Sequence, residues 1–354
     1  MGFGGQEIRI LAESRWLATR GWRVLLAVQP DSRLLVEAAR AGLRALTVRM
    51  RGAWDVAAIV ALRQLIRSER VDVVHTHSSV DAWVGGLAAR ACGAAVVRSR
   101  HVSIPVPRRR ALVYRLAHRV ITSGEAVADI LRAAGVPAER VVAIGPGVDT
   151  ARFHPGVSGA AVRAELGLSG AAVGLVANIR GSKGHVHFLE AAQAVLAERP
   201  DARFLIVGDG VGFDDVRRRV REMGLQERVT LTGFRRDVPE VMAALDVLVL
   251  PSVKSEAMSQ VIPQALAVGT PVVGTTVGGT PELVRDGETG RLVPPADSRA
   301  LAAAILDLLR DPARARALAR RGQALVLELH SLDATMARTA DVYAAARRAA
   351  GREA

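Results

Sequence analysis

One short segment in the second half of the chain combines glycines with cationic side chains that suit phosphate binding. Residues 176–191 read VANIRGSKGHVHFLEA, in which an apolar run ends near Ala177 and a helical pattern follows the turn. Glycines let a phosphate approach the backbone, a helix start offers free N–H groups, and Arg180 and Lys183 add positive charge. The chain holds 46 arginines and only 2 lysines, so a codon preference does not explain Lys183. The segment predicts a phosphate-binding turn; a solvated basic turn is the alternative.

A second segment, residues 204–220, reads FLIVGDGVGFDDVRRRV. Gly208 and Gly210 follow an apolar run and precede a helical pattern, but the G-x-G-x-x-G spacing of dinucleotide sites is not met. On its own this segment indicates a tight strand–helix turn.

The most specific stretch is residues 251–295, which open with PSVKSEAMSQVIPQALAVGTPVVGTTVGGTPELV. Glu256 precedes a helix that we expect to start near Ser259. The N–H groups of its first turn, from Met258 to Gln260, would then point at the strand ends and bind a phosphate. Gln264 lies eight residues after Glu256 on the same helix, and a second glycine-rich turn follows the next strand. The alternative is a buried glutamate that caps its own helix.

Strands and helices must position these turns, and short β-branched runs alternate with longer amphipathic patterns along the chain. Many of the short runs are continuously apolar, which is typical of strands covered on both faces of a parallel sheet. The alternation predicts βαβ units and an α/β fold of two doubly wound, Rossmann-like domains. Expected strands are residues 23–28, 45–49, 71–75, 95–99, 119–122, 141–144, 172–177, 203–207, 229–232, 247–250, 271–274 and 290–293. Expected helices are residues 8–20, 56–68, 81–91, 125–134, 185–198, 213–223, 238–244, 261–268 and 332–350.

The alternation breaks after about residue 145, where GPGVDTARFHPGVSG indicates a connector. We therefore expect an N-terminal domain at 1–150, a linker at 151–169, a C-terminal domain at 170–330 and a helical tail at 331–354. Two such domains would face each other across a cleft, where ligands bind at the carboxyl ends of strands. The glycines of MGFGGQE come first, where a doubly wound domain has a strand before them. The N-terminal sheet is thus expected to lack an inner strand.

Composition excludes several classes of protein. No apolar run approaches the ~18–20 residues that span a bilayer. Glu7, Arg9 and Glu13 interrupt the apolar stretch that a signal peptide needs. Cys92 is the single cysteine, which excludes an intrachain disulfide and any multi-cysteine metal site and favours a reducing, cytoplasmic compartment.

The formal net charge of +13 is unevenly distributed. Residues 1–150 hold 22 arginines and 12 acidic residues, a net of +10, against +3 for the remainder. Basic and aromatic residues are not interleaved, so nucleic acid is not expected as a partner. One interpretation of this charge is a peripheral contact with the inner face of an anionic membrane, where each basic residue contributes ~1 kcal/mol of binding free energy. The other interpretation is a genome-wide preference for arginine codons. Residues 100–119, RHVSIPVPRRRALVYRLAHR, are the predicted acceptor- or membrane-facing loop.

Together these segments resemble glycosyltransferase family 4, a retaining group with the GT-B fold. In residues 170–300 the resemblance rests on the K-G turn, the strand ending in V-G-D-G, TGFRRDVPEVMAALDVLVLPS, and the Glu256 segment with its following glycine-rich turn. In the first half it rests on GGQE, VDVVHTHSS, RSRHVSIP and IGPGVD. It implies transfer of a hexose-type sugar from a nucleotide-sugar donor to a lipid-linked or envelope glycan acceptor, and a C-terminal helix that returns to the N-terminal domain. The alternatives are a nucleotide-sugar 2-epimerase of the same fold and a degenerate, non-catalytic nucleotide-sugar-binding protein.

The resemblance also implies roles for individual positions. Arg180 and Lys183 would contact the donor diphosphate and stabilise the leaving nucleotide, which is commonly the largest catalytic contribution. Glu256 would hold hydroxyls of the donor sugar, and His101 would lie beside the transferred sugar. The other substrate-binding positions are Gly4 and Gly5 on the opposite wall of the cleft, Gly233 and Phe234 near the base, the amides of Met258 and Ser259 against the sugar and distal phosphate, Gly208, and Gln264.

Two positions depart from the family pattern. Gln264 replaces a second glutamate that takes the ribose hydroxyls; because an amide still accepts one hydrogen bond, donor binding weakens by ~1–2 kcal/mol without being lost. Arg180 and Lys183 are also closer in sequence than the commoner family spacing. His75 and His77 share a strand face, but no third ligand is evident and no D-x-D motif occurs. Neither a metal ion nor another cofactor is therefore expected.

Overall fold

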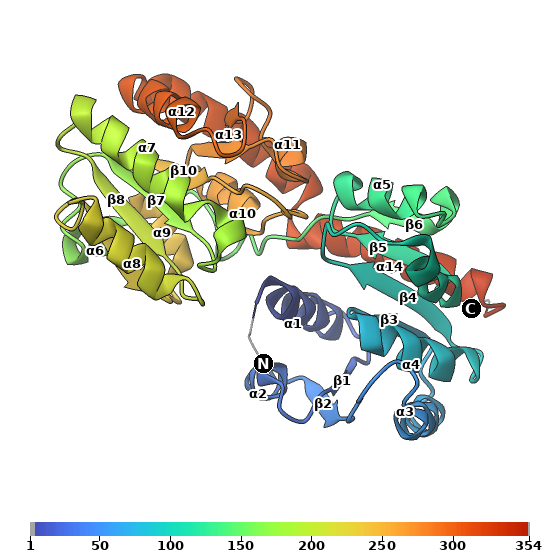
Figure 1. The fold of residues 1–354 in the computed structure, drawn as a ribbon. Coiled ribbons are helices and arrows are strands. Elements are labelled where there is room, and N and C mark those ends of the chain that lie inside the picture. Colours follow the sequence, from blue (N-terminus) through green and yellow to red (C-terminus); the bar gives the residue numbers. More distant parts are fainter. Residues whose placement is uncertain (1–3, 353–354) are drawn as a thin grey trace. The chain divides into compact units, whose positions relative to one another are not determined.

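The computed structural model describes residues 4–352, which form two compact units (Figure 1). Unit 1 contains the described residues up to Gly147 and those from Leu332 onward, and unit 2 runs from Val148 to Ser331. The first and last residues of unit 2, Val148 and Ser331, form a β-bridge, so the chain enters and leaves this unit at neighbouring positions. Each unit is built on parallel strands with helices packed against them, as the sequence predicts.

Unit 2 holds a six-stranded, all-parallel sheet in the order β12-β11-β10-β7-β8-β9. Every residue of its two central strands, β7 and β10, is buried. Both faces of the sheet are covered, which explains why these strands appear in the sequence as unbroken apolar runs. The strands are β7 (Ala172–Val176), β8 (Arg203–Val207), β9 (Val229–Gly233), β10 (Val247–Leu250), β11 (Val272–Thr275) and β12 (Arg291–Val293).

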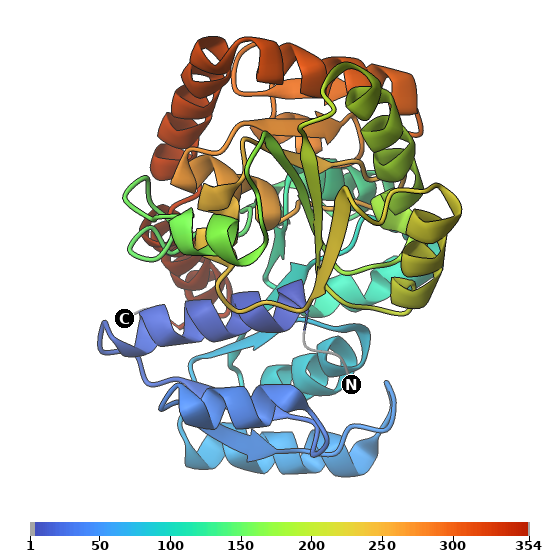
Figure 2. The ribbon, with the colours of Figure 1, turned by 90° about the vertical axis from the view of Figure 1, so that its left-hand side faces the viewer.

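Successive side chains of the unit 2 strands pack into two different cores. Val173 belongs to one core cluster with Phe188 of α7 and Ile305 of α12, whereas its neighbour Ala172 belongs to the other with Ile262 of α10. The pleat of a strand imposes this alternation, and Figures 1 and 2 show helices on either side of the sheet. The helices are α6 (Ala160–Glu165), α7 (His185–Glu198), α8 (Phe213–Glu222), α9 (Val238–Ala244), α10 (Val261–Val268), α11 (Thr280–Leu283), α12 (Ser298–Arg310) and α13 (Pro312–Leu329), with a 3-10 turn at Gly181–Lys183.

The stretch expected to be a linker, residues 151–169, is packed as part of unit 2. It contains α6, and Phe153, Val162 and Leu168 are buried in the core cluster that also holds α10. Its glycines and prolines therefore serve turns within packed structure rather than a free connector.

The strands of unit 1 form two separate sheets. Strands β1 (Leu25–Val28) and β2 (Arg44–Thr47) form a parallel pair. A second, four-stranded parallel sheet has the order β3-β4-β5-β6. Its strands are β3 (Val73–Thr76), β4 (Ala95–Arg100), β5 (Arg119–Thr122) and β6 (Val141–Ala143). No strand pairing joins β1 to β3 within residues 4–352, and that part of the chain opens with helix α1 rather than with a strand.

The C-terminal helix α14 (Leu332–Ala349) belongs to unit 1, which confirms the expected return of this helix. It packs on β4, where Met336 and Val342 share a core cluster with Val97. Trp16 of α1 and Arg20, which follows the end of that helix, each donate to the Asp333 carboxylate at 2.5 Å. The other helices of unit 1 are α1 (Gly5–Ala18), α2 (Arg33–Arg40), α3 (Val56–Ser68), α4 (Ser79–Arg90) and α5 (Glu125–Ala133), with 3-10 helices at Arg108–Leu116 and Ala138–Arg140.

Candidate active site

Lys183 and Glu256 form an ion pair at the carboxyl ends of two neighbouring strands. Lys183 ends the 3-10 turn that follows β7, and Glu256 lies in the loop after β10. The Lys183 Nζ lies 2.5 Å from the Glu256 Oε2, and the two side chains are 11% and 7% exposed. Because β7 and β10 are adjacent and parallel, their ends meet at one edge of the sheet, where α/β proteins bind ligands. The structure thus brings together two of the residues predicted to be catalytic.

Two hydroxyl groups hold the Glu256 carboxylate in place. The Ser252 Oγ donates to the Glu256 Oε2 at 2.7 Å, and the Thr275 Oγ1 donates to the Ser252 carbonyl at 2.6 Å. Ser252 and Thr275 are both buried. Thr275 is the last residue of β11, so the ends of three neighbouring strands contribute to this arrangement. The sequence analysis missed both residues, although a small hydroxyl residue at the end of an apolar strand is the signal that marks them.

The loops around the pair approach so closely that two positions require glycine. Gly184 has φ +70°, and a Cβ there would lie 1.9 Å from the Pro251 carbonyl oxygen. Gly278 has φ +58°, and a Cβ there would lie 1.5 Å from the Glu256 carbonyl oxygen. Only glycine adopts left-handed backbone at no cost and leaves room for such contacts. The two glycine-rich turns of the sequence therefore position Lys183 and Glu256.

The backbone immediately before Glu256 is strained. Ser255 has φ +58°, a left-handed conformation that costs a non-glycine residue on the order of 1–3 kcal/mol. The amide of Gly279 donates to the carbonyls of Glu256 and Ala257, at 3.2 and 3.0 Å, and so holds the loop in this shape. Strain of this kind is typical of functional loops.

The helix after Glu256 is α10 (Val261–Val268), which has the bounds of the helix expected at residues 261–268. It starts two residues beyond Ser259, where the sequence analysis also placed its first turn, and the Ser259 Oγ accepts a hydrogen bond from the Val261 amide at 3.3 Å. Met258 and Ser259 are buried in the loop that leads into α10, and Met258 belongs to a core cluster. Gln264 is half-buried on α10. The predicted amides therefore belong to the loop and not to the helix.

The remaining predicted residues of unit 2 lie at or just after the ends of β7, β8 and β9. A Cβ on Gly208, which has φ +139°, would lie 1.9 Å from the Ala177 carbonyl oxygen, so the turn after β8 presses on the end of β7. The Gly208 amide donates to the Gly233 carbonyl at 2.9 Å, which joins the ends of β8 and β9. Phe234 is 65% exposed, and Arg180 is exposed at the start of the 3-10 turn. An exposed phenylalanine beside a strand end suits a stacking contact.

His101 belongs to a cluster of histidines in unit 1. The His101 Nε2 lies 3.2 Å from the His77 Nδ1. The His75 Nδ1 lies 2.8 Å from the Tyr343 hydroxyl, and the His75 Nε2 lies 2.8 Å from the Ser99 hydroxyl. Burial, together with the charges of neighbouring histidines, holds the pKa of His75 and of His101 well below the usual value. Both rings are therefore neutral near pH 7, and each offers one donor and one acceptor.

Gly4 and Gly5 lie at the start of α1. The Gly4 amide donates to the Glu7 Oε2 at 2.9 Å, and Gly5 is the first residue of the helix. The predicted site residues are thus divided: these two glycines and His101 belong to unit 1, and all the others belong to unit 2. Among residues 4–352 no group of three or more His, Cys, Asp or Glu side chains is arranged to hold a metal ion. No helix in that range is long and apolar enough to cross a bilayer.

Comparisons with known proteins identify the family of the chain. Residues 170–311 match the model for glycosyl transferases group 1, and residues 3–152 match the model for glycosyltransferase family 4. The chain is 31% identical over 360 residues to the 2-deoxystreptamine glucosyltransferase of Streptomyces kanamyceticus, covering 90% of this chain and 92% of that protein. It is 32% identical to the 2-deoxystreptamine N-acetyl-D-glucosaminyltransferase of Streptomyces fradiae, with 88% and 84% covered.

Solved structures share the fold. The chain superposes on Anabaena Alr3699/HepE in complex with UDP with a TM-score of 0.85 at 23% identity, over 96% of this chain and 95% of that one. It superposes on sucrose-phosphate synthase from Thermosynechococcus elongatus with a TM-score of 0.79 at 26% identity, over 96% and 93%. With both family models matched and relatives aligned over most of the chain, this protein belongs to glycosyltransferase family 4 and is a glycosyltransferase with the GT-B fold.

Proposed function

We propose that this glycosyltransferase moves a hexose-type sugar from a nucleotide-sugar donor to a hydroxyl acceptor, with retention at the anomeric carbon. The observation that carries the proposal is the almost completely buried Lys183–Glu256 ion pair at the strand ends of unit 2. A buried ion pair adds little net stability, because both ions lose their hydration. Its chemistry suits such a donor, since an ammonium binds a diphosphate and a carboxylate accepts from sugar hydroxyls.

Donor binding would give Lys183 a new partner. The diphosphate would replace Glu256 beside the Lys183 Nζ, and the exposed Arg180 would add a second cation. The freed carboxylate would then accept hydrogen bonds from the donor sugar. Each well-placed donor to the departing diphosphate lowers the barrier by ~3–4 kcal/mol.

The reaction itself needs no further protein base in this proposal. The acceptor oxygen forms a bond to the anomeric carbon on the face from which the diphosphate departs. The bond between that carbon and the diphosphate oxygen breaks, and the same phosphate oxygen takes the acceptor proton. Attack and departure on one face give retention. Lys183 and Arg180 balance the charge, so no divalent metal is required.

The other predicted residues surround this chemistry. Gly208 would line the donor site, Gly233 and Phe234 would contact the base, and Gln264 would bind the ribose. The amides of Met258 and Ser259, which lie in the strained loop after Glu256, would meet the sugar and the distal phosphate. In unit 1, His101, whose ring is neutral, stays a prediction for binding the transferred sugar, and Gly4 and Gly5 stay predictions for binding the phosphates.

A lipid-linked or envelope glycan is the acceptor class that we propose first. The chain is 29% identical, over 68% of its length and 66% of the relative, to an Escherichia coli enzyme named UDP-Gal:alpha-D-GlcNAc-diphosphoundecaprenol alpha-1,3-galactosyltransferase. Arg108, Arg109 and Arg110 are exposed side by side, which suits a peripheral contact with an anionic membrane at its inner face.

A cyclitol acceptor is the second candidate. The two Streptomyces relatives above are named for 2-deoxystreptamine, and a further relative, 32% identical over 79% of this chain, is named D-inositol 3-phosphate glycosyltransferase. All three names describe transfer to a hydroxylated six-membered carbocycle.

A donor screen followed by a transfer assay tests the proposal. Thermal shift against a panel of nucleotide sugars selects the donor, and mass spectrometry then detects transfer to undecaprenyl-diphosphate glycans and to cyclitols. Lys183→Ala should lower kcat by ~100-fold or more. Lys254→Ala is the matched control, because this second lysine is exposed in the loop that carries Glu256, and it should leave kcat unchanged. Donor epimerisation without an acceptor, or donor binding with neither transfer nor hydrolysis, would contradict the proposal.

A further inference from the structure

The carboxyl end of β4 in unit 1 carries two arginines that the proposed function does not use. Arg98 and Arg100 are two residues apart on this strand and therefore project from the same face of the sheet. Both contact Tyr114 of the 3-10 helix that follows. The Arg98 guanidinium carbon lies 4.0 Å from the centroid of the Tyr114 ring, and the Arg100 Nη1 donates to the Tyr114 hydroxyl at 3.1 Å. One buried tyrosine thus holds two cations close together.

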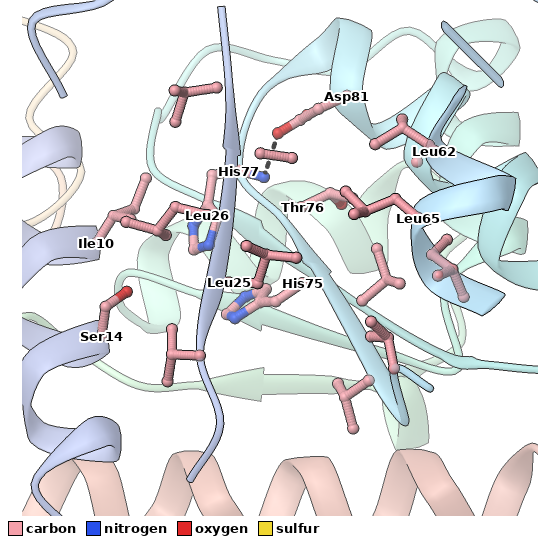
Figure 3. Close-up of a pocket in the computed structure, with 18 of the residues that line it drawn as sticks. Ile10, Ser14, Leu25, Leu26, Leu62, Leu65, His75, Thr76, His77 and Asp81 are labelled. Carbon is pink, nitrogen blue, oxygen red and sulfur yellow. Dashed lines mark hydrogen bonds between the residues drawn. The ribbon is translucent and has the colours of Figure 1, made fainter. Parts of the chain in front are cut away.

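Arg98 is a buried cation without a counter-ion in the described part of the chain. It is 6% exposed, and its Nε and Nη1 have no hydrogen-bond partner. Asp81 of α4 attracts the guanidinium, but its carboxylate accepts from the amides of His77 and Ser78 at 2.8 and 2.7 Å (Figure 3). Burial lowers the pKa of Arg98 below its usual value, although Tyr114 and Asp81 act in the opposite direction. The folded chain therefore does not fully compensate the cost of burying this charge.

Further donors without a partner lie around the two arginines. The Arg100 Nε and the hydroxyls of Ser103 and Ser123 are buried and have no hydrogen-bond partner within residues 4–352. The Ser123 amide donates to the Arg100 carbonyl at 3.2 Å. Ser103 precedes Ile104, whose carbonyl accepts from the Arg100 guanidinium. Together with the two nitrogens of Arg98, five such atoms gather at the carboxyl ends of β4 and β5. Because buried polar groups nearly always have a partner, this cluster indicates a ligand that accepts hydrogen bonds.

The chemistry of the cluster favours a phosphate group as this ligand. A guanidinium presents its N–H groups as a planar fork that matches two oxygens of a phosphate. The hydroxyls of two serines can donate to further oxygens. A phosphate monoester carries about −1.5 to −2 charges at neutral pH, which balances two arginines, whereas a carboxylate balances only one.

We propose that Arg98 and Arg100 bind a phosphate group of the acceptor. The identification of the ligand as the acceptor rests on the proposed function, whereas the anion site itself does not. Arg100 directly precedes His101, the residue predicted to lie beside the transferred sugar, and both are half-buried at the end of β4. A ligand reaches the site from this half-buried end, and Arg98 forms its floor. The site therefore selects a phosphorylated acceptor, either a diphosphate-linked lipid glycan or a cyclitol phosphate, over an unphosphorylated cyclitol.

Inorganic phosphate is the first probe, because thermal unfolding detects its binding without any transfer reaction. At about ten times its Kd, phosphate should raise the Tm of the parent protein by ~3–6 °C relative to chloride at equal ionic strength. Arg98→Met should lose most of this shift. Methionine keeps a long, polarizable side chain against the Tyr114 ring, so the variant should remain folded. Arg67→Met, at an exposed arginine of α3, is the matched control and should keep the shift. Lys183→Ala should also keep it, which separates this site from the donor site proposed for unit 2.

Transfer kinetics test the assignment to the acceptor. With an undecaprenyl-diphosphate glycan or with inositol 3-phosphate, Arg98→Met should raise the acceptor KM at least ~10-fold, as expected for the loss of a hydrogen bond between charged groups. The value of kcat should change much less, because the site binds the acceptor away from the bond that is formed. With unphosphorylated inositol the variant and the parent protein should have the same KM.

Equal phosphate shifts for the parent protein and Arg98→Met overturn the anion site. A shift that is lost in Arg98→Met while the KM of both phosphorylated acceptors is unchanged overturns the assignment to the acceptor. If Arg98→Met does not remain folded, Arg100→Gln takes its place, since glutamine keeps a donor for the Ile104 carbonyl and removes the charge; an undiminished shift then overturns the site. If no acceptor is glycosylated, the proposed function is wrong, and the phosphate shifts still decide whether the anion site exists.

Discussion

Replacing Glu256 with alanine tests whether the Lys183–Glu256 pair is energetically coupled. The change removes the carboxylate 2.5 Å from an ammonium whose side chain is 11% exposed. Removing one partner of a buried pair costs about 3–5 kcal/mol, because the other charge stays buried without its counter-ion. Lys183 needs only a small movement to reach water, so we expect the lower end, ~3 kcal/mol. For a domain of this size each kcal/mol lowers Tm by ~2–4 °C, which predicts a fall of ~6–12 °C.

Calorimetry of a double-mutant cycle provides the assay. Lys183→Ala removes the stranded charge, so the double variant should be more stable than the sum of the two single losses by ~1–3 kcal/mol. Glu227→Ala, at an exposed glutamate of unit 2, is the control for replacing a carboxylate and should change stability by less than ~0.5 kcal/mol. Strict additivity of the two site variants would refute the reasoning, because it would mean that the pair does not form in solution.

Three further predictions concern the backbone, pH and the membrane. Gly278→Ala should destabilise the protein by ~1–3 kcal/mol more than Gly287→Ala. Both glycines have left-handed backbone, but only at Gly278 would the added Cβ collide with a carbonyl oxygen. Urea unfolding measures the difference in stability, and equal losses for the two variants would contradict the prediction. Burial, aided by nearby arginines, lowers the pKa of His118 to about 4. Between pH 6.5 and 4 the unfolded chain binds a proton that the folded chain does not, so the urea midpoint should fall from pH 7 to pH 5. His118→Asn, which keeps a hydrogen-bond acceptor, should reduce that fall, and an unchanged pH dependence would count against it. Replacing the exposed arginines 108–110 with alanine should abolish salt-sensitive sedimentation with anionic liposomes. If the unsubstituted protein does not sediment with these liposomes, the proposed membrane contact is wrong and the arginines are only a basic surface.

Local patterns were enough to predict most of the strands of unit 2. The expected strands at 203–207 and 247–250 coincide with β8 and β10. These strands are buried on both faces, so their apolar runs have clear ends in the sequence. α2 (Arg33–Arg40), in contrast, was not predicted.

The shape of the Glu256 loop could not be read from the local pattern. The expected helix at residues 261–268 matches α10, but Met258 and Ser259, whose amides were expected in its first turn, lie in the loop before it. The cause lies elsewhere in the chain: the turn at Gly278 and Gly279 packs on the Glu256 carbonyl and holds the loop, including left-handed Ser255, in a non-helical form. A contact between distant segments overrides the local preference.

Contacts between site residues that are distant in the sequence depend on the order of strands in the sheet, which the sequence analysis did not predict. Lys183 and Glu256 are 73 residues apart and meet because β7 lies next to β10. His75 contacts Tyr343, which is 268 residues away on the returning helix α14. The sequence analysis correctly placed His75 and His77 close together, since their rings lie 4.1 Å apart, but it did not predict their bonds to Tyr343 and His101.

Calorimetric titration with the nucleoside diphosphate of the selected donor tests the central claim most directly. The account predicts that Lys183→Ala weakens binding of that diphosphate at least ~10-fold, or ~1.4 kcal/mol, and that Lys254→Ala binds it as the parent protein does. Lys183→Ala should not weaken binding of the corresponding nucleoside without phosphates, because that ligand has no phosphate for Lys183 to contact. Equal affinity of the parent protein and the Lys183 variant for the diphosphate would contradict the account.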